Sequence, residues 1–215
     1  MSALAELRLV AESCTACGLA ATRNSVVFGA GAADADLMFV GEAPGRNEDL
    51  QGEPFVGAAG QLLDRLLDEA GIARERTYIA NVLKCRPPNN RDPRPEEIDA
   101  CKGYLRSQLE LVDPTVVVTL GNFATKLLLR TETGITRLRG RSYRWWRDKV
   151  LVPTYHPAAA LRGGDRITDL MRKDFQLMRA ALDQAGTDGD DTPPVAQSDD
   201  DGPGAEEPTQ LGLFG

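Results

Sequence analysis

The sequence lacks any long hydrophobic run. No stretch reaches the ~18 consecutive apolar residues that a membrane-spanning helix needs. The first residues, MSALAELRLVAES, also lack the basic start and the long apolar segment of a secretion signal. We therefore expect a cytoplasmic protein with no membrane partner. Because cytosolic cysteines are mostly reduced, the four cysteines of the chain favour metal ligation over disulfides.

The C-terminal end of the chain has no basic residues. Residues 184–215 contain eight acidic residues and no Lys or Arg. Without these eight, the formal net charge of −7 becomes about +1 for the first 183 residues, so the body of the protein could face a polyanion. The end of the chain is rich in Asp, Gly, Pro, Ser and Thr and cannot bury enough apolar surface to fold. We expect a disordered acidic linker there.

Short apolar runs alternate with helical patterns along the first 183 residues. The runs DLMFVG, TYIAN, PTVVVTLG and KVLVPTY have the length and composition of buried strands. Segments such as GAAGQLLDRLLDEAGI carry leucines at helical spacing between them. This alternation predicts an α/β domain with a mostly parallel sheet and helices on both faces. Ligands of such sheets bind at the carboxyl ends of the strands.

All four cysteines fit one metal site. Cys14 and Cys17 form a C-x-x-C pair, Cys85 ends the second strand, and Cys101 lies inside a helix. Four thiolates can close a tetrahedral zinc site or hold an iron–sulfur cluster, and spacing alone does not choose between them. The alternative is four unrelated buried thiols. A thioredoxin-like redox pair is disfavoured, since that motif opens a helix after a strand.

The loop after the first strand, GEAPGRNEDLQGEPFVG, has the composition of a small-ligand site. It contains neither G-x-G-x-x-G nor a G-K-[ST] ending, so it is a poor phosphate loop. Its glycines and Pro44 indicate backbone amides pressed close to a ligand. Glu42 and Glu48 offer carboxylates, and Phe55 offers a flat apolar face.

Two further strands end in candidate binding residues. Asn81 closes the second strand, and its amide can both donate and accept, which suits the edge of a nucleobase. His156 is the single histidine of the chain, and a lone histidine is more often structural than catalytic. It nevertheless ends a strand just before a proline, on the same expected rim as the other two loops, which favours a functional role.

These segments together resemble the uracil-DNA glycosylases, specifically the iron–sulfur group called family 4. GEAPG…ED…PFVG, NVLKCRPPNNR and HP…LR match the motifs of that family in order, over roughly residues 14–180. The resemblance implies a three-layer α/β/α fold with a central four-stranded, mainly parallel sheet. It also implies a [4Fe–4S] cluster of structural role on Cys14, Cys17, Cys85 and Cys101.

The resemblance implies that the protein flips deoxyuridine out of DNA and hydrolyses the N-glycosidic bond to release uracil. Phe55 would stack on uracil, and Asn81 would hydrogen-bond its N3–H and O4. His156 would donate to O2 as negative charge builds on the departing base. The backbone amides on the O2 side would come from Gly41, Glu42 and Ala43.

The group that positions the attacking water is less directly implied. Better-known relatives carry Asp where this chain has Ala43, so the task passes to Glu42 first or to Glu48 second. Glu48 could instead crowd the C5 position of the base and exclude thymine. The alternative for both carboxylates is loop capping, since acids near helix starts are usual.

Contacts to the DNA strand are expected from two regions. Leu161 would wedge into the duplex, and Arg162 would contact the backbone. Relatives commonly place Ser where this chain has Ala158, so one hydroxyl contact to a phosphate is expected to be missing or replaced by backbone amides. Residues 126–149 carry eight basic residues against two acids, interleaved with aromatics, and form either a phosphate-tracking surface or a hairpin whose aromatics face the core.

The last six residues, QLGLFG, resemble the peptide with which bacterial proteins bind the sliding clamp. Here Gln210 would anchor and Leu213 and Phe214 would fill an apolar pocket, with Leu211 completing the motif. We therefore expect a glycosylase domain over residues 1–183, an acidic linker over 184–209 that acts as a tether, and a clamp-binding peptide over 210–215.

Two rival functions remain open at this stage. One is a relative that traps itself covalently on uracil-containing DNA, but those proteins carry an extra histidine in a longer basic loop, and RPPNNRDPRP has none. The other is a non-catalytic, metal-bearing DNA-binding or clamp accessory protein. We expect a monomer whose partners are uracil-containing DNA and the sliding clamp.

Overall fold

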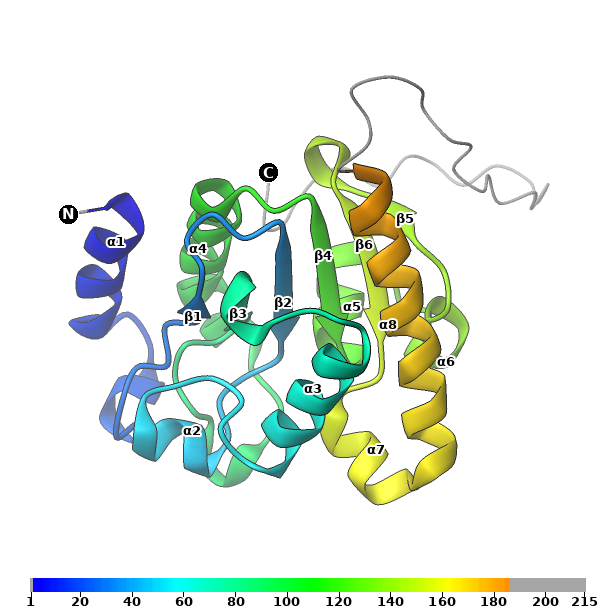
Figure 1. Cartoon of the computed structure of the whole chain (residues 1–215). Helices are drawn as coiled ribbons and strands as arrows, with labels where there is room; N and C mark the ends of the chain where they lie inside the picture. The colour runs from blue at the N-terminus through cyan, green and yellow to red at the C-terminus, as the bar shows by residue number, and fades with distance from the viewer. Residues whose placement is uncertain (1, 186–215) are drawn as a thin grey trace, which may run out of the picture.

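The computed structural model describes residues 2–185, which form a six-stranded sheet in the order β1-β3-β2-β4-β6-β5 with helices on both faces (Figure 1). The three-layer α/β/α fold is confirmed. The expected four parallel strands are β2 (Leu37–Gly41), β3 (Thr77–Asn81), β4 (Val116–Leu120) and β6 (Val150–Thr154). Two antiparallel edge strands of two residues each, β1 (Ala30–Gly31) and β5 (Tyr143–Arg144), extend the sheet beyond those four.

The four parallel strands are apolar because both of their faces are covered. Every residue of β2, β3 and β4 is buried, as expected for central parallel strands. β2 pairs in register with β3, so that Gly41 lies opposite Asn81 at the carboxyl ends. β4 pairs with β2 and β6. The loops that follow these strands therefore meet at one edge of the sheet.

Alternate residues of β2 face two separate cores. Phe39 packs with leucines of α3 (Ala58–Glu69) and with Phe175 of α8 (Asp165–Ala185) on one face. Met38 packs with residues of α4 (Pro95–Val112) and α5 (Asn122–Leu129) on the other. α1 (Ala3–Glu12) covers α4, and α7 (Pro157–Gly163) contacts α3 and α8. The short helical elements are α2 (Arg46–Gln51), α6 (Ile135–Leu138), η1 (Gly18–Ala21), η2 (Arg74–Arg76), η3 (Pro88–Asn90) and η4 (Trp146–Asp148).

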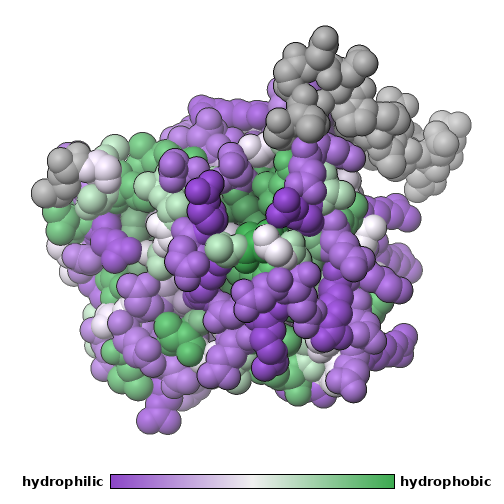
Figure 2. All heavy atoms as spheres, in the orientation of Figure 1, coloured by the Kyte–Doolittle hydropathy of each residue, from purple (hydrophilic) through white to green (hydrophobic). Residues whose placement is uncertain are grey.

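Hydrophilic side chains cover most of the face that carries α8 (Figure 2), as expected for an amphipathic helix over a core. None of the helices within residues 2–185 combines the length and hydropathy needed to span a bilayer. α8 continues to Ala185, two residues past the expected end of the glycosylase domain at 183. The acidic linker and the clamp-binding peptide, apart from the end of α8, lie outside the described residues.

The two tryptophans of the basic segment 126–149 face the interior. Trp145 and Trp146 pack against the core cluster formed with α4 and α5. The indole N–H of Trp145 donates to the carbonyl of Leu128 at 2.9 Å. Of the two interpretations of this segment, the structure therefore favours the hairpin with core-facing aromatics over a surface on which bases could stack.

Candidate active site and cysteine cluster

A cavity of about 1020 Å³ opens at the carboxyl ends of the parallel strands; we call it the strand-end cavity. Its lining includes residues at or just beyond the carboxyl ends of β2, β3, β4 and β6. Predicted site residues that line it are Glu42, Ala43, Glu48, Phe55, Asn81, His156 and Arg162. Segments that are far apart in the chain thus converge on one concave site. This is expected for a parallel sheet with helices on both faces, because the loops after its strands meet at one edge.

Gly41 lies directly against two of the predicted base-binding residues. A Cβ at this position would lie 2.3 Å from Oδ1 of Asn81 and 3.0 Å from Cζ of Phe55. Only a glycine therefore lets the Asn81 amide and the Phe55 ring approach the end of β2 this closely. The Phe55 ring in turn stacks on the His156 ring, with 5.5 Å between centroids and 29° between planes.

Asn81 carries a buried polar atom without a partner. Its side chain is almost fully buried at 2% relative exposure, and Oδ1 accepts no hydrogen bond from any described residue. An unsatisfied buried acceptor costs about 1–3 kcal/mol, so such groups are rare unless a ligand completes them. The Asn81 side chain lines the strand-end cavity, and a bound N–H donor would satisfy its oxygen.

His156 is held as a neutral donor. Its Nδ1 accepts the backbone N–H of Ala158 at 3.1 Å, which caps the start of α7 and leaves the proton of the neutral ring on Nε2. Burial, together with the positive charge of Arg162, lowers the pKa of His156 to about 4, and the charge of Glu48 only partly opposes this shift. The imidazole is therefore uncharged at neutral pH. Because the amide of Ala158 is engaged by His156, this amide is not free to replace the serine hydroxyl of relatives at a phosphate.

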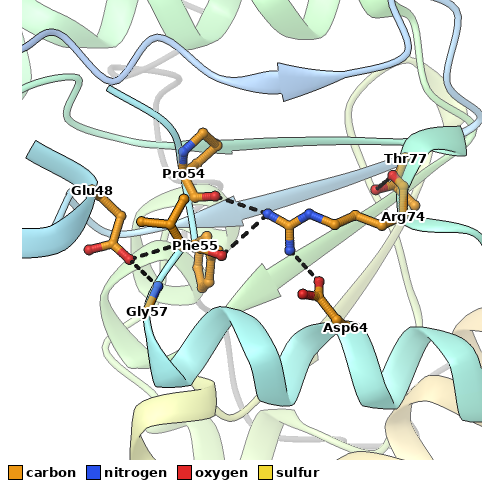
Figure 3. A network of polar contacts seen from close by, with 8 residues as sticks. Glu48, Pro54, Phe55, Gly57, Asp64, Arg74 and Thr77 are labelled. Carbon is orange, nitrogen blue, oxygen red and sulfur yellow. Dashed lines mark hydrogen bonds and ion pairs between the residues drawn. The ribbon is translucent and has the colours of Figure 1, made fainter. Parts of the chain in front are cut away.

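The turn that carries Phe55 is held by Glu48 on one side (Figure 3). Phe55 has a φ of 55°, a left-handed conformation that costs a non-glycine residue about 1–2 kcal/mol. Glu48 Oε1 accepts the backbone N–H groups of Val56 at 3.2 Å and Gly57 at 3.3 Å. Glu48 thus caps the loop at the start of α3 while also lining the strand-end cavity.

Arg74 holds the same turn from the other side (Figure 3). Its Nη2 donates to the carbonyl of Pro54 at 2.9 Å and to that of Phe55 at 3.4 Å, and its Nη1 pairs with Asp64 of α3. Gly60 permits this geometry, because a Cβ there would lie 1.7 Å from the Phe55 carbonyl oxygen. The strained turn is therefore held by two side chains: the Glu48 carboxylate accepts hydrogen bonds from its amides, and the Arg74 guanidinium donates to its carbonyls.

Two carboxylates of the cavity lining, Glu42 and Asp92, interact electrostatically. Burial raises the pKa of Glu42, and the nearby charge of Asp92 raises it further. Asp92 lies in the proline-rich loop after β3, and it was not among the predicted site residues although it lines the cavity. A buried carboxyl with a raised pKa beside a second carboxylate is suited to a role in proton transfer.

Other lining residues were also missed by the sequence analysis. Asn122, Lys126 and Arg130 come from α5 and its C-terminal end, directly after β4. The rule that ligands bind at strand ends could have found them, since β4 is one of the four predicted parallel strands. Leu161, in contrast, is 49% exposed on α7 and is absent from the cavity lining, next to Arg162, which lines it.

The four cysteines line a second, small cavity between the N-terminal segment, the end of β3 and α4. Cys85 and Cys101 are buried, and Cys14 and Cys17 are half-buried. Burial raises the pKa of Cys85 to about 11, partly offset by the guanidinium of Arg23, whose Nη1 donates to Sγ at 3.5 Å. A metal or cluster that bound here would displace the protons of these thiols.

The four thiols lie around one small cavity, so they could share one metal group. Within residues 2–185, no group of three Cys, His, Asp or Glu side chains is close enough to hold one metal ion. A tetrahedral zinc ion needs its ligands around a single centre. A four-iron cluster binds each cysteine to a different iron atom, so its ligands lie farther apart. Four cysteines around one cavity match the number and type of ligands that an iron–sulfur cluster needs.

Comparison with known proteins agrees with this geometry. The family model described as the uracil DNA glycosylase superfamily matches residues 28–184. A type-4 uracil-DNA glycosylase of Archaeoglobus fulgidus is 51% identical over 156 residues, which cover 69% of this chain and 78% of that protein. Type-4 uracil-DNA glycosylases of Sulfurisphaera tokodaii and Thermotoga maritima are 44% and 43% identical, covering 83% and 81% of this chain and 84% and 92% of their own lengths. This chain belongs to the uracil DNA glycosylase superfamily, and within it to the type-4 uracil-DNA glycosylases.

Proposed function

We propose that this protein is a DNA repair glycosylase that flips deoxyuridine out of DNA and hydrolyses its N-glycosidic bond, releasing uracil for base excision repair. The observation that carries the proposal is the unpartnered Oδ1 of Asn81 in a cavity that also contains Phe55 and His156. The N3–H of uracil is the donor that this oxygen lacks. The relatives named type-4 uracil-DNA glycosylase support the same activity.

Base recognition follows from the hydrogen-bonding groups of Asn81. Its oxygen accepts N3–H of uracil while its NH₂ donates to O4. Cytosine presents an acceptor at N3 and a donor at N4, so both contacts become repulsive and the base is rejected. Flipping costs a few kcal/mol, and stacking on Phe55 returns about 1–3 kcal/mol of it.

Bond cleavage is assisted by His156. As the glycosidic bond breaks, negative charge develops on uracil, and the Nε2–H of the neutral imidazole donates to O2. A donor in place before the reaction stabilises the transition state without reorganisation. The amides of Gly41, Glu42 and Ala43 complete the O2 side of the pocket.

Water attack on the sugar is assigned to Glu42, with Asp92 as its partner. Burial and the nearby charge of Asp92 raise the pKa of Glu42, so the Glu42 carboxylate is a stronger base than an ordinary exposed glutamate. Glu48 is engaged with the Phe55 turn through Oε1, which favours a positioning role for it over water activation. It also lines the cavity, so exclusion of thymine by Glu48 stays part of the proposal.

DNA contacts are assigned to the rim of the strand-end cavity. Arg162, Lys126 and Arg130 line the cavity and can neutralise phosphates. The exposed side chain of Leu161, next to Arg162, is available to fill the space that the flipped nucleotide leaves. Leu161→Ala should then lower the rate on duplex DNA and leave the rate on single-stranded DNA unchanged, and an unchanged duplex rate would reject the wedge.

A [4Fe–4S] cluster on Cys14, Cys17, Cys85 and Cys101 is the proposed cofactor. When bound, it supplies cross-links between the N-terminal segment, the end of β3 and α4, and no redox chemistry is needed for hydrolysis. Sliding-clamp binding by residues 210–215 is proposed as the means of recruitment to replicating DNA.

Uracil release from an oligonucleotide with one deoxyuridine tests the activity. We expect release from deoxyuridine but not from deoxycytidine or thymidine. His156→Ala should lower the rate about 10²–10³-fold, as loss of a transition-state donor does elsewhere. Lys173→Met, an exposed change on α8, is the matched control. Iron-loaded wild-type protein that releases no uracil would refute the proposal, and a stable protein–DNA adduct would favour the covalent relative.

A further inference from the structure

Lys84 is a buried cation without an anionic partner among the described residues. Its side chain is 1% exposed, and its Nζ donates to the carbonyl of Asn81 at 2.7 Å and to Oε1 of Gln108 at 2.5 Å. Both acceptors are neutral. The other buried lysine of residues 2–185, Lys149, pairs with the carboxylate of Asp113 at 2.5 Å. A buried ammonium that has only neutral partners is costly to the fold.

Among residues 2–185, the ionisable groups that interact electrostatically with Lys84 are cysteines. Lys84 lines the same small cavity as the four thiols, and its backbone N–H donates to Sγ of Cys101 at 3.3 Å. Its electrostatic partners are Cys101 and Cys85. These groups become anionic thiolates when they bind a metal cluster.

Gln108 is held so that its neutral oxygen faces Lys84. Its Nε2 donates to the carbonyl of Phe28 at 2.8 Å and to the hydroxyl of Tyr78 at 3.0 Å, which leaves Oε1 as the acceptor for Lys84. A glutamate at this position would supply a negative charge beside the ammonium. Because the Gln108 amide is neutral, it does not compensate the positive charge of Lys84, and this charge can interact with the thiolates instead.

We propose that Lys84 is the buried counter-ion of the cysteine-bound cluster and, through its hydrogen bond to the Asn81 carbonyl, the positioning residue that links the cluster to uracil recognition. The inference rests on the cluster proposed above. Lys84 lies between the two sites in the chain: Asn81, three residues earlier, lines the strand-end cavity, and Cys85 follows Lys84 directly. Loss of the cluster would leave Lys84 uncompensated and loosen the backbone that aims Asn81.

The test compares the iron-loaded full-length protein with Lys84→Met and Lys84→Gln, and with Lys173→Met as control. Lys84→Met removes the charge and the hydrogen bonds, while Lys84→Gln keeps a donor without the charge. Three quantities are measured: the half-life of bound iron against a chelator, the reduction potential of the cluster, and the KM for a deoxyuridine oligonucleotide.

Both Lys84 variants should release iron at least about tenfold faster, because breaking a buried charge pair costs several kcal/mol and about 1.4 kcal/mol is a factor of ten. Their reduction potentials should become more negative, since a nearby positive charge favours the reduced cluster. KM should rise in Lys84→Met. Lys173→Met should match the wild type throughout.

The outcomes separate this inference from the cluster itself. Wild-type protein without iron would refute the cluster, and Lys84 would lose its proposed role with it. Iron-loaded Lys84 variants with the half-life and potential of the wild type would overturn the counter-ion role and leave the cluster proposal standing. If Lys84→Gln kept the wild-type reduction potential while Lys84→Met did not, the counter-ion role would also be overturned. A hydrogen-bond donor at this position, rather than its positive charge, would then be enough to set the potential. If both variants are insoluble, Gln108→Glu decides, since its carboxylate should make the potential more negative with Lys84 in place.

Discussion

Arg74→Met should loosen the turn that presents Phe55 to the substrate. In the native protein the guanidinium binds the carbonyls of Pro54 and Phe55 and pairs with Asp64, and Arg74 does not line the strand-end cavity. Methionine keeps most of the apolar stem of the side chain and removes the donors. The change therefore tests whether the turn needs to be held for catalysis.

The expected size of the effect follows from the contacts. A hydrogen bond from a charged donor contributes about 1.5–3 kcal/mol. Side-chain exposures of 28% for Arg74 and 43% for Asp64 place the loss at the lower end of that range. The left-handed conformation of Phe55 costs about 1–2 kcal/mol, so the loss is comparable to the strain that the contacts offset. A loss of about 1.4 kcal/mol would reduce the population of the binding-competent turn about tenfold. The apparent affinity for the flipped base would fall by the same factor.

Single-turnover kinetics at increasing enzyme concentration separate binding from chemistry. We expect the half-saturating concentration of Arg74→Met on deoxyuridine DNA to rise about tenfold, with a smaller change in the maximal rate. Arg76→Met, an exposed arginine of the same η2 turn, is the control for lost positive charge. If Arg74→Met loses thermal stability but keeps the kinetics of Arg76→Met, the turn does not depend on this contact and the reasoning is wrong.

Three further predictions concern other parts of the molecule. Gly41→Ala should lower uracil release at least about a hundredfold with an unchanged circular dichroism spectrum, because the new methyl would lie 2.3 Å from Asn81 Oδ1; near-normal activity would contradict the packing. Burial holds the pKa of His156 at about 4, below its usual 6.5, so protonation favours the unfolded state. The free energy of unfolding, measured with denaturant, should therefore fall by about 3 kcal/mol more in the wild type than in His156→Gln between pH 6.5 and pH 4. If the free energies of the two proteins change in parallel with pH, this prediction is wrong. Deletion of residues 210–215 should abolish pull-down by the sliding clamp and leave glycosylase activity intact, and retained pull-down would exclude the peptide.

Much of the fold could be predicted from local patterns. The four parallel strands are short, mostly apolar runs, and the helices between them carry leucines at helical spacing. The edge strands β1 and β5 could not be predicted in this way, because two residues show no periodicity and their pairing depends on the strand beside them. The direction in which the tryptophans of residues 126–149 point likewise depends on tertiary packing.

The candidate site could be predicted in part. The strand-end rule brought Phe55, Asn81 and His156 together because parallel strands place their following loops at one edge. It was applied to three loops and missed the fourth, after β4. The contacts of Arg74 and Lys84 required the structure, since each joins segments whose proximity depends on helix packing. The proton on Nε2 of His156 was also beyond the sequence, because it follows from the Ala158 amide at Nδ1.

A crystal structure of the iron-loaded protein with uracil bound tests the central claim most directly. The account predicts one uracil in the strand-end cavity, stacked on Phe55, with N3 within hydrogen-bonding distance of Asn81 Oδ1 and O2 facing Nε2 of His156. Uracil bound elsewhere, with Asn81 Oδ1 still lacking a donor, would contradict the account.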